Sequence, residues 1–351
     1  MRSIRWWWLP AFTLTGTTLS VRMVPSLRSF AVLMAGVAAV TAHAVLPPPV
    51  PVVVPSLETG ANGMPTMIPA LLFRPLGATA NAGVPLVVAL HGCGGMFGPR
   101  SGREPALSER FSTWTEQFLA DGYAVLWPDS FTPRGHREIC TTKMGDRTIT
   151  AASRRLDVLG ALEFAAKLPG IDAQRIAVVG WSHGGSTTLA AINSENSRVA
   201  RFRARAESPP FFRAAVALYP GCSTPLRDGP KWRPATTASI HIGASDDWTP
   251  AAPCVALAES MREAGQPLTV RVYPDSYHGF DAPAGRIIVR RDVPNGVNPG
   301  QGVTQGPNPA ARAAASDSVR AFLREQLAPT TATKAHAEAP APAASTAPTS
   351  N

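Results

Sequence analysis

Short apolar runs rich in β-branched residues recur along the middle of the chain, and segments with helical periodicity separate them. The apolar runs are residues 86–90, 123–127, 176–179, 214–218, 239–242 and 268–272. The helical segments are residues 104–120, 153–167, 186–192, 251–264 and 310–326. Buried strands that alternate with helices predict an α/β fold, in which helices cover both faces of a mainly parallel sheet. In such folds, functional sites lie at the carboxyl ends of the strands.

The N-terminal residues predict export. Residues 23–44 carry a positive charge on Arg28, an apolar run over 30–40, and small residues at Ala42 and Ala44 around a cleavage site. This is the pattern of a secretory signal peptide. An uncleaved anchor is the alternative, but the run is short for a membrane span, and the prolines that follow would end a helix. We therefore predict a secreted or periplasmic protein with no stable membrane span after cleavage.

Composition divides the chain into four predicted parts. These are a signal peptide at 1–44, a Pro-rich leader at 45–64, one domain at 65–327, and a disordered tail at 328–351. The signal peptide starts at Met23 or, with residues 1–22 as an upstream extension, at Met1. The tail is rich in Ala, Pro, Thr and Ser and has no periodicity, so it cannot bury an apolar face.

Charge and residue spacing argue against several classes of partner. The 351 residues carry a net charge of +9, and four arginines with no acidic residue lie in the first 44, so the remainder carries +5. A weak excess that is spread along the chain is not the clustered basic surface of a nucleic-acid-binding protein. No His or Cys cluster has metal-ligand spacing, and no phosphate-binding loop is evident, so we predict no metal, ATP or other cofactor.

The sequence Gly180-Trp181-Ser182-His183-Gly184 joins the apolar run 176–179 to a predicted helix. A G-x-S-x-G motif between a strand and a helix predicts a nucleophile elbow, a sharp turn that exposes the serine at a helix N-terminus. The glycines are needed because side chains at their positions would collide with the sheet and the helix. The alternative is a tight turn whose serine only caps the helix. We predict that Ser182 is a nucleophile.

A serine nucleophile needs a base and an acid, which follow it in that fold in the order Ser, acid, His. His278 is the histidine that follows Ser182 and an acidic candidate within the predicted domain. The acid should emerge after the run 239–242, where Asp246 and Asp247 are adjacent. Neighbouring side chains point in different directions, so one of the two faces His278, and the residues alone leave the choice open.

An oxyanion hole requires two backbone N–H groups directed at the developing negative charge. His183, directly after the nucleophile, is predicted to supply one. Cys93, in the sequence His91-Gly92-Cys93-Gly94-Gly95 after the run 86–90, is predicted to supply the other, because glycines let that loop approach the substrate.

An ordered set of motifs resembles the dienelactone hydrolase family of α/β-hydrolases over roughly residues 65–327. The motifs are HGCGG (91–95), PDSFTPRG (128–135), GWSHGG (180–185), YPGC (219–222), GASDDWTP (243–250) and YHGFD (277–281). The resemblance implies an α/β-hydrolase fold of about eight strands and acyl-transfer chemistry. It also implies Asp246 as the acid, since the family's acid stands four residues before a proline, and Asp247 stays in reserve.

One departure from the family bears on the substrate. Members that open dienelactones carry a cysteine in the elbow, whereas this chain has Ser182. The resemblance therefore implies acyl transfer on another ester. We predict a secreted serine hydrolase that cleaves a small-molecule or polymeric carboxylic ester through an acyl-serine. The alternatives are a prolyl-oligopeptidase-type serine peptidase and a catalytically silent binding protein on a hydrolase scaffold.

The fold implied by the resemblance also predicts disulfides and a pocket. In that fold Cys93 and Cys140 follow neighbouring strands, as do Cys222 and Cys254, so in an oxidising compartment we predict Cys93–Cys140 and Cys222–Cys254. Trp181 and Trp248 are expected either to wall the acyl pocket or to serve packing alone. Arg134 either grips an acidic substrate or, as we favour, forms a structural ion pair with the helix that carries Arg155 and Asp157.

Overall fold

The structure is a computed structural model that describes residues 46–60, 62–79, 81, 83–98 and 106–329. The predicted signal peptide with its extension, and nearly all of the predicted tail, lie outside the described residues. The central feature is an eight-stranded sheet in the order β1-β2-β4-β3-β5-β6-β7-β8. Its strands are β1 (Val50–Thr59), β2 (Pro65–Phe73), β3 (Val84–Leu90), β4 (Ala124–Pro128), β5 (Ile171–Trp181), β6 (Ala214–Leu218), β7 (Thr237–Gly243) and β8 (Leu268–Tyr273).

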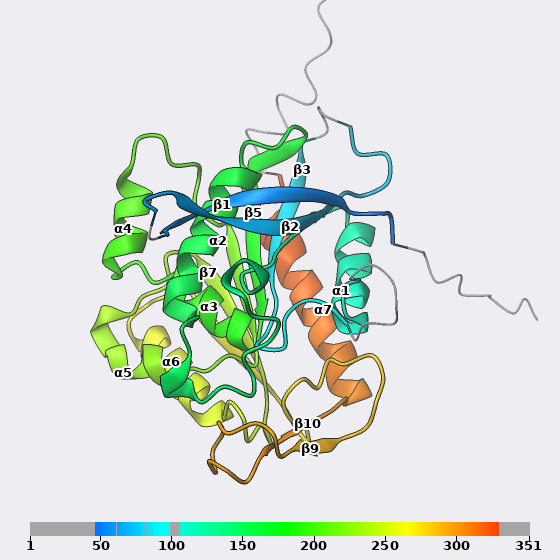
Figure 1. The fold of residues 1–351 in the computed structure, drawn as a ribbon, viewed down its shortest axis with the longest axis vertical. Helices are drawn as coiled ribbons and strands as arrows, with labels where there is room; N and C mark the ends of the chain where they lie inside the picture. Colours follow the sequence, from blue (N-terminus) through cyan, green and yellow to red (C-terminus); the bar gives the residue numbers. More distant parts are fainter. Residues whose placement is uncertain (1–45, 61, 80, 82, 99–105, 330–351) are drawn as a thin grey trace, which may run out of the picture. The chain divides into compact units, whose positions relative to one another are not determined.

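Six strands that are neighbours in the sheet, β4, β3, β5, β6, β7 and β8, run parallel. At one edge, β2 pairs antiparallel with β4 and β1 pairs antiparallel with β2. Helices cover both faces (Figure 1). The helices are α1 (Glu109–Ala120), α2 (Ala151–Ala165), α3 (His183–Ala191), α4 (Ser197–Ala204), α5 (Ser223–Asp228), α6 (Ala251–Glu263) and α7 (Pro309–Gln326). The sequence prediction of a mainly parallel sheet in an α/β-hydrolase fold is confirmed.

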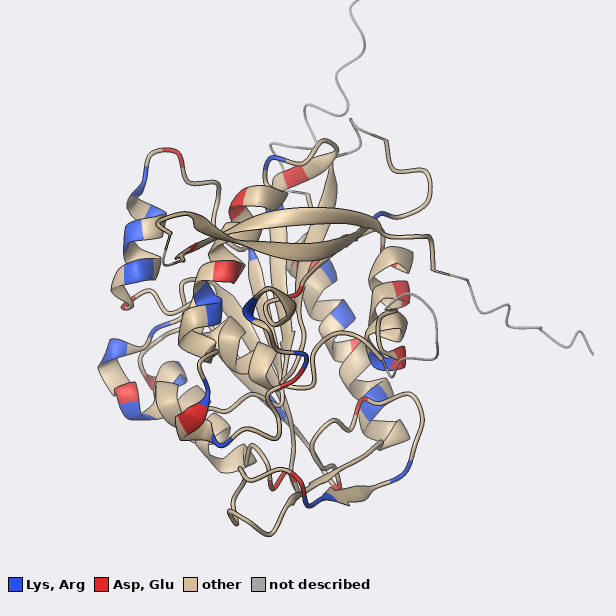
Figure 2. Ribbon diagram, in the orientation of Figure 1, with Lys and Arg blue, Asp and Glu red and all other residues tan. Residues whose placement is uncertain are grey.

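The central strands carry almost no charge because both of their faces are covered. Every residue of β4 and β6 is buried, and Figure 2 shows most of the charged residues on the helices and loops around the sheet. On one face α1 and α7 lie side by side, where Arg320 donates two hydrogen bonds of 2.7 Å to Asp121. On the other face α2 packs against α3. This cover leaves the carboxyl ends of the strands as the place where loops can form a site.

The sheet begins earlier than the sequence predicts. The segment 45–64, expected to be a Pro-rich leader, contributes β1, which pairs with β2 and packs on α2, so the leader prediction is wrong for residues 50–59. Proline is compatible with β1 because an edge strand leaves one row of N–H positions unpaired. At Gly160 of α2 the approach is so close that a Cβ would lie 2.2 Å from the Pro55 carbonyl oxygen.

A two-stranded arm follows the predicted base in the chain. It consists of β9 (Ile288–Arg290) and β10 (Val303–Gln305), which pair antiparallel. His278 forms an isolated β-bridge with Gln305. Asp247 holds the arm, since its carboxylate accepts hydrogen bonds of 2.7 Å from both the backbone N–H and the hydroxyl of Thr304. The arm is thereby fixed against the turn that carries the two aspartates.

All four cysteines are in disulfides. Cys93 is bonded to Cys140, and Cys222 to Cys254, as predicted. The first bond ties the loop after β3 to the loop after β4, and the second ties α5 to α6. None of the helices in the described residues combines the length and the apolar character that a membrane span needs.

Candidate active site

The turn between β5 and α3 has the strained geometry that the G-x-S-x-G motif predicts. Ser182 adopts φ 54° and ψ −116°, in a region that a residue with a side chain seldom occupies. A Cβ at Gly180 would lie 2.2 Å from the Gly184 carbonyl oxygen, and one at Gly184 would lie 2.0 Å from that of Leu90. Close backbone contacts therefore require glycine at both positions. Ser182 is the N-cap residue of α3.

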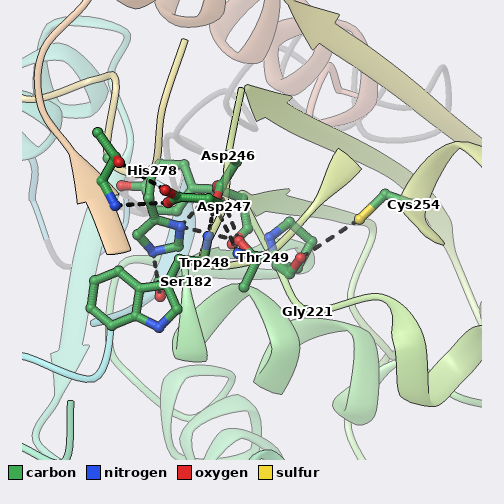
Figure 3. A network of polar contacts seen from close by, with 12 residues as sticks. Ser182, Gly221, Asp246, Asp247, Trp248, Thr249, Cys254 and His278 are labelled. Atoms are coloured by element: carbon green, nitrogen blue, oxygen red, sulfur yellow. Dashed lines mark hydrogen bonds and ion pairs between the residues drawn. The ribbon is translucent and has the colours of Figure 1, made fainter. Parts of the chain in front are cut away.

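The structure brings three of the predicted site residues together (Figure 3). Nε2 of His278 lies 2.9 Å from the Ser182 hydroxyl oxygen, and Nδ1 of His278 lies 2.8 Å from a carboxylate oxygen of Asp246. His278 and Asp246 are buried, each 4% exposed. The His278 ring thus connects the hydroxyl of Ser182, 96 residues away in the chain, to the carboxylate of Asp246, 32 residues away. This arrangement can move a proton from the hydroxyl to the ring while the carboxylate stabilises the charged ring.

Backbone donors hold the Asp246 carboxylate in place. The N–H groups of Trp248 and Thr249 donate to one of its oxygens at 2.9 and 2.8 Å, and the Thr249 hydroxyl lies 3.1 Å from the other. These bonds orient the acid toward His278. Its neighbour Asp247 points to the β9–β10 arm instead, so the two carboxylates have separate partners (Figure 3).

A buried carboxylate anchors the loop that carries His278. Asp281 accepts hydrogen bonds from the indoles of Trp114 and Trp181 and from the hydroxyl of Tyr219, at 2.8 to 3.0 Å, and pairs with Arg110 at 3.2 Å. Burial raises the pKa of Tyr219 well above its ordinary value, so this hydroxyl stays a donor. The sequence alone predicts no such role for Asp281, Trp114, Tyr219 or Arg110. The only signal was the Asp281 of the YHGFD motif, three residues after His278.

The two predicted oxyanion-hole residues flank the nucleophile. Among the described residues, the backbone N–H groups of Cys93 and His183 have no hydrogen-bond acceptor. The loop after β3 approaches the elbow closely, since a Cβ on Gly92 would lie 3.3 Å from the Ser182 Cβ. The pKa of His183 is held well below its ordinary value, first by burial and then by the charge of Arg154, so its ring is neutral.

A cavity of about 680 Å³ opens beside Ser182. Cys93, His183 and Trp248 line it together with residues of α2, α3 and α5 and the 295–297 segment. The ring centroid of Trp248 lies 4.6 Å from that of His278, so this residue both lines the cavity and packs against the predicted base. A second cavity, of about 660 Å³, lies at the opposite strand ends near Arg175 and contains none of the predicted site residues.

Trp181 and Arg134 are not among the described residues that line the cavity beside Ser182. Trp181 is fully buried, with its ring centroid 5.4 Å from that of Trp127, so it packs in the core, where its indole also donates to Asp281. Successive residues of a strand point to opposite faces of the sheet. Gly180 faces α3, so Trp181 points to the opposite face, where it packs against Trp114 of α1. Arg134 bonds both oxygens of Asp157 at 2.8 and 3.0 Å and also pairs with Glu58. This is the structural ion pair that the sequence favoured.

Potential metal ligands are not gathered anywhere in the described part of the chain: no group of three or more His, Cys, Asp or Glu side chains has a suitable arrangement.

Comparison with known families agrees with the geometry. The sequence model of the Dienelactone hydrolase family matches residues 70–327, which is more than half of the chain. The chain belongs to the dienelactone hydrolase family. The resemblance read from the motifs is thereby confirmed, and with it an assignment to a family of hydrolases. The family match spans every predicted site residue, from Cys93 to His278.

Individual relatives of this dienelactone hydrolase family member are distant. Acylamino-acid-releasing enzyme 1 of Oryza sativa subsp. japonica is 27% identical over 167 residues, 36% of this chain and 20% of that protein. Quorum-quenching protein AidA of Acinetobacter baumannii (strain MDR-ZJ06) is 28% identical over 152 residues, 43% of each chain. The chain thus spans less than half the length of either relative.

Solved structures share the fold. Esterase 2 of Thermogutta terrifontis, phosphorylated by paraoxon, superposes with a TM-score of 0.52 and 15% identity, over 82% of this chain and 98% of that one. At this identity the likeness concerns the arrangement of strands and helices.

Proposed function

We propose that this member of the dienelactone hydrolase family is an exported serine hydrolase that cleaves carboxylic esters. Ser182 is the nucleophile, His278 the general base and Asp246 the acid. The observation that carries the proposal is the continuous hydrogen-bonded chain from the Ser182 hydroxyl through His278 to Asp246, with the serine in a strained elbow. The esterase among the structural neighbours supports the same class of substrate.

The proposed reaction has two half-reactions. Nε2 of His278 takes the proton of the Ser182 hydroxyl as its oxygen attacks the ester carbonyl carbon, and Asp246 stabilises the imidazolium. The N–H groups of Cys93 and His183 bind the oxyanion of the tetrahedral intermediate. The C–O bond to the alcohol breaks, and the alcohol leaves with the proton from His278. A water molecule, deprotonated by His278, then attacks the acyl-serine and releases the carboxylic acid and the free serine.

The cavity beside Ser182 has room for substrates larger than acetate esters. Its volume of about 680 Å³ falls within the range of pockets that enclose small organic ligands. Trp248 beside His278 offers a flat apolar surface for the acyl or alcohol group. We propose a small-molecule or polymeric ester whose reactive portion enters this cavity.

Export rests on the sequence pattern of residues 23–44 and on the two disulfides, which persist in oxidising compartments. N-terminal sequencing of the protein recovered from the medium or the periplasm tests it. We expect a mature chain that begins directly after Ala44. Recovery of the intact chain from the cytoplasm would contradict export.

A peptidase is the second candidate, favoured by the similarity to acylamino-acid-releasing enzyme 1. A panel of p-nitrophenyl esters and of acylated and free aminoacyl anilides separates the two, with wild type and Ser182→Ala measured in parallel. We expect turnover of the esters that Ser182→Ala abolishes. Turnover of anilides alone would support the peptidase, and ester turnover undiminished in Ser182→Ala would refute the proposed nucleophile.

A further inference from the structure

We infer that Arg154 is a positioning residue for the oxyanion hole, an inference that rests on the proposed function. Arg154 lies in the first half of α2 and is fully buried. One guanidinium nitrogen, Nη1, donates to the His91 carbonyl oxygen at 3.0 Å and to Nδ1 of His183 at 2.9 Å. The same atom therefore holds the loop after β3 and the elbow after β5.

The two partners of Arg154 belong to the two halves of the proposed oxyanion hole. His91 stands two residues before Cys93, whose N–H is one proposed donor. His183 itself supplies the other. A hole of this kind depends on the separation and direction of two N–H groups carried by different loops. A shared donor between those loops fixes that separation before the substrate binds.

The contact also sets the protonation of His183. A guanidinium can only donate, so Nδ1 of His183 must be the acceptor, and the proton of the neutral ring lies on Nε2. The pKa of His183 is lowered by burial and by this neighbouring charge, which agrees with a neutral ring. This hydrogen bond thereby fixes the orientation of the His183 ring.

The bonded partners of Arg154 are the His91 carbonyl and the His183 ring, and no carboxylate is among them. Asp157, on the same helix, is already bonded by both nitrogens of the Arg134 fork and by the Ser56 hydroxyl at 2.6 Å. Among the described residues, Nε and Nη2 of Arg154 have no hydrogen-bond partner. A buried cation without a bonded carboxylate destabilises a fold. A charge and a donor at this place beside the elbow can act on the reaction.

The positive charge acts in the same direction as the geometry. Burial lowers the pKa of Arg154 to about 10, so the group is charged at neutral pH. Its guanidinium lies over the Phe131 ring, 5.0 Å from the centroid, in surroundings that water does not screen. A fixed cation in such surroundings stabilises an anion that forms nearby more strongly than it stabilises the neutral ester. Its effect should therefore appear in kcat rather than in KM.

The test compares Arg154→Met and Arg154→Lys with Arg175→Met as the matched control. Arg175 is also largely buried and donates to a backbone carbonyl, that of Gly83, but at the opposite ends of the strands. Ester turnover, the rate of Ser182 labelling by a fluorophosphonate, and the melting temperature are measured for each variant.

We expect Arg154→Met to lower kcat on the order of 10²-fold with KM within about threefold of wild type. The labelling rate and the affinity for a trifluoromethyl ketone, which forms an oxyanion on Ser182, should fall in proportion. Arg154→Lys should recover part of the loss, and Arg175→Met should change melting temperature only.

Three results would overturn the inference: unchanged kcat in a folded Arg154 variant, a rise in KM in place of the fall in kcat, or failure of both Arg154 variants to fold. The last would show that the guanidinium serves the fold. The labelling arm separates this inference from the proposed function. A wild type that labels at Ser182 but turns over no ester refutes ester hydrolysis, while the labelling rates still decide the role of Arg154. A wild type inert to both probes would refute both.

Discussion

Asp246 presents a carboxylate oxygen 2.8 Å from Nδ1 of His278, on the side of the ring opposite to Ser182. If this carboxylate orients the ring and stabilises its charged form, Asp246→Asn should lower kcat on the order of 10³-fold, because the amide can favour the wrong tautomer. Stability should change little, since the shape of the side chain is kept. Steady-state kinetics with a p-nitrophenyl ester checks both the fall in kcat and the near-constant KM.

Asp247 offers the matched comparison for this prediction. Its carboxylate bonds Thr304 and so holds the β9–β10 arm. Asp247→Asn should lower the melting temperature, because a charge-assisted hydrogen bond is worth about 1.5 to 3 kcal/mol. It should leave kcat within about tenfold of wild type, because Asp247 bonds Thr304 and not His278. A larger loss of kcat in Asp247→Asn than in Asp246→Asn would reverse the assignment of the acid.

The strands that carry the site could be predicted because their burial on both faces leaves continuous apolar runs. Ser182 and His278 follow from motif context and chain order, and both have the partners that the sequence predicted. The choice between Asp246 and Asp247 could not be made from the residues alone. It depends on the turn at 246–249, where two backbone N–H groups hold the Asp246 carboxylate and its other oxygen lies beside His278.

Contacts between distant segments explain what the sequence analysis missed. Strand β1 has prolines at 51 and 55 and reads as a leader, yet it is stabilised by pairing with β2 and by packing on Gly160. The direction of Trp181 depends on which sheet face α3 occupies, and no spacing along the chain states that. The bonds of Arg154 to His91 and His183 span 63 and 29 residues, and a helical position alone gives no sign of them.

The glycines of the elbow are predicted to be essential for folding. Gly180→Ala places a Cβ 2.2 Å from the Gly184 carbonyl oxygen, where the backbone of α3 leaves no room for it. We expect the free energy of unfolding to fall by at least about 2 kcal/mol, as overpacking of a rigid site does. Gly145→Ala is the control, since a Cβ there meets nothing within 4 Å. Denaturant unfolding of both variants checks this, and equal stability of the two would contradict the elbow geometry.

Arg134 is predicted to contribute to stability and not to substrate binding. Arg134→Met removes the two bonds to the buried Asp157, and we expect a loss of about 3 kcal/mol in the free energy of unfolding, because a buried carboxylate is left unpaired. Glu58→Gln, on the more exposed side of the same arginine, should cost much less. KM for neutral and for carboxylate-bearing esters should stay unchanged in both variants. A selective rise in KM for the acidic ester in Arg134→Met would restore a binding role.

Acid should destabilise the fold through buried neutral histidines. Burial lowers the pKa of His241 from 6.5 to about 3 in the folded chain. The unfolded chain therefore binds a proton that the folded chain does not, so this contribution is complete above pH 6.5 and is lost as the pH falls toward 3. At pH 5 the loss from His241 alone is about 2 kcal/mol.

Its replacement by a side chain that does not titrate tests this contribution. His241→Gln should show a shallower decline of unfolding free energy between pH 7 and pH 5 than wild type, by roughly that amount. The pKa values of His91 and His183 are also lowered by burial, so the variant keeps part of the slope. Urea unfolding at a series of pH values measures both slopes, and identical slopes would show that His241 titrates normally in the fold.

The reactivity of Ser182 and its dependence on His278 form the central claim, and covalent labelling measures them most directly. The mature protein is treated with a fluorophosphonate, digested and mapped by mass spectrometry, beside His278→Gln. The account predicts one modified site, Ser182, and a labelling rate that falls on the order of 10²-fold or more in His278→Gln. Modification at another residue, or equal labelling of Ser182 in both proteins, would contradict it.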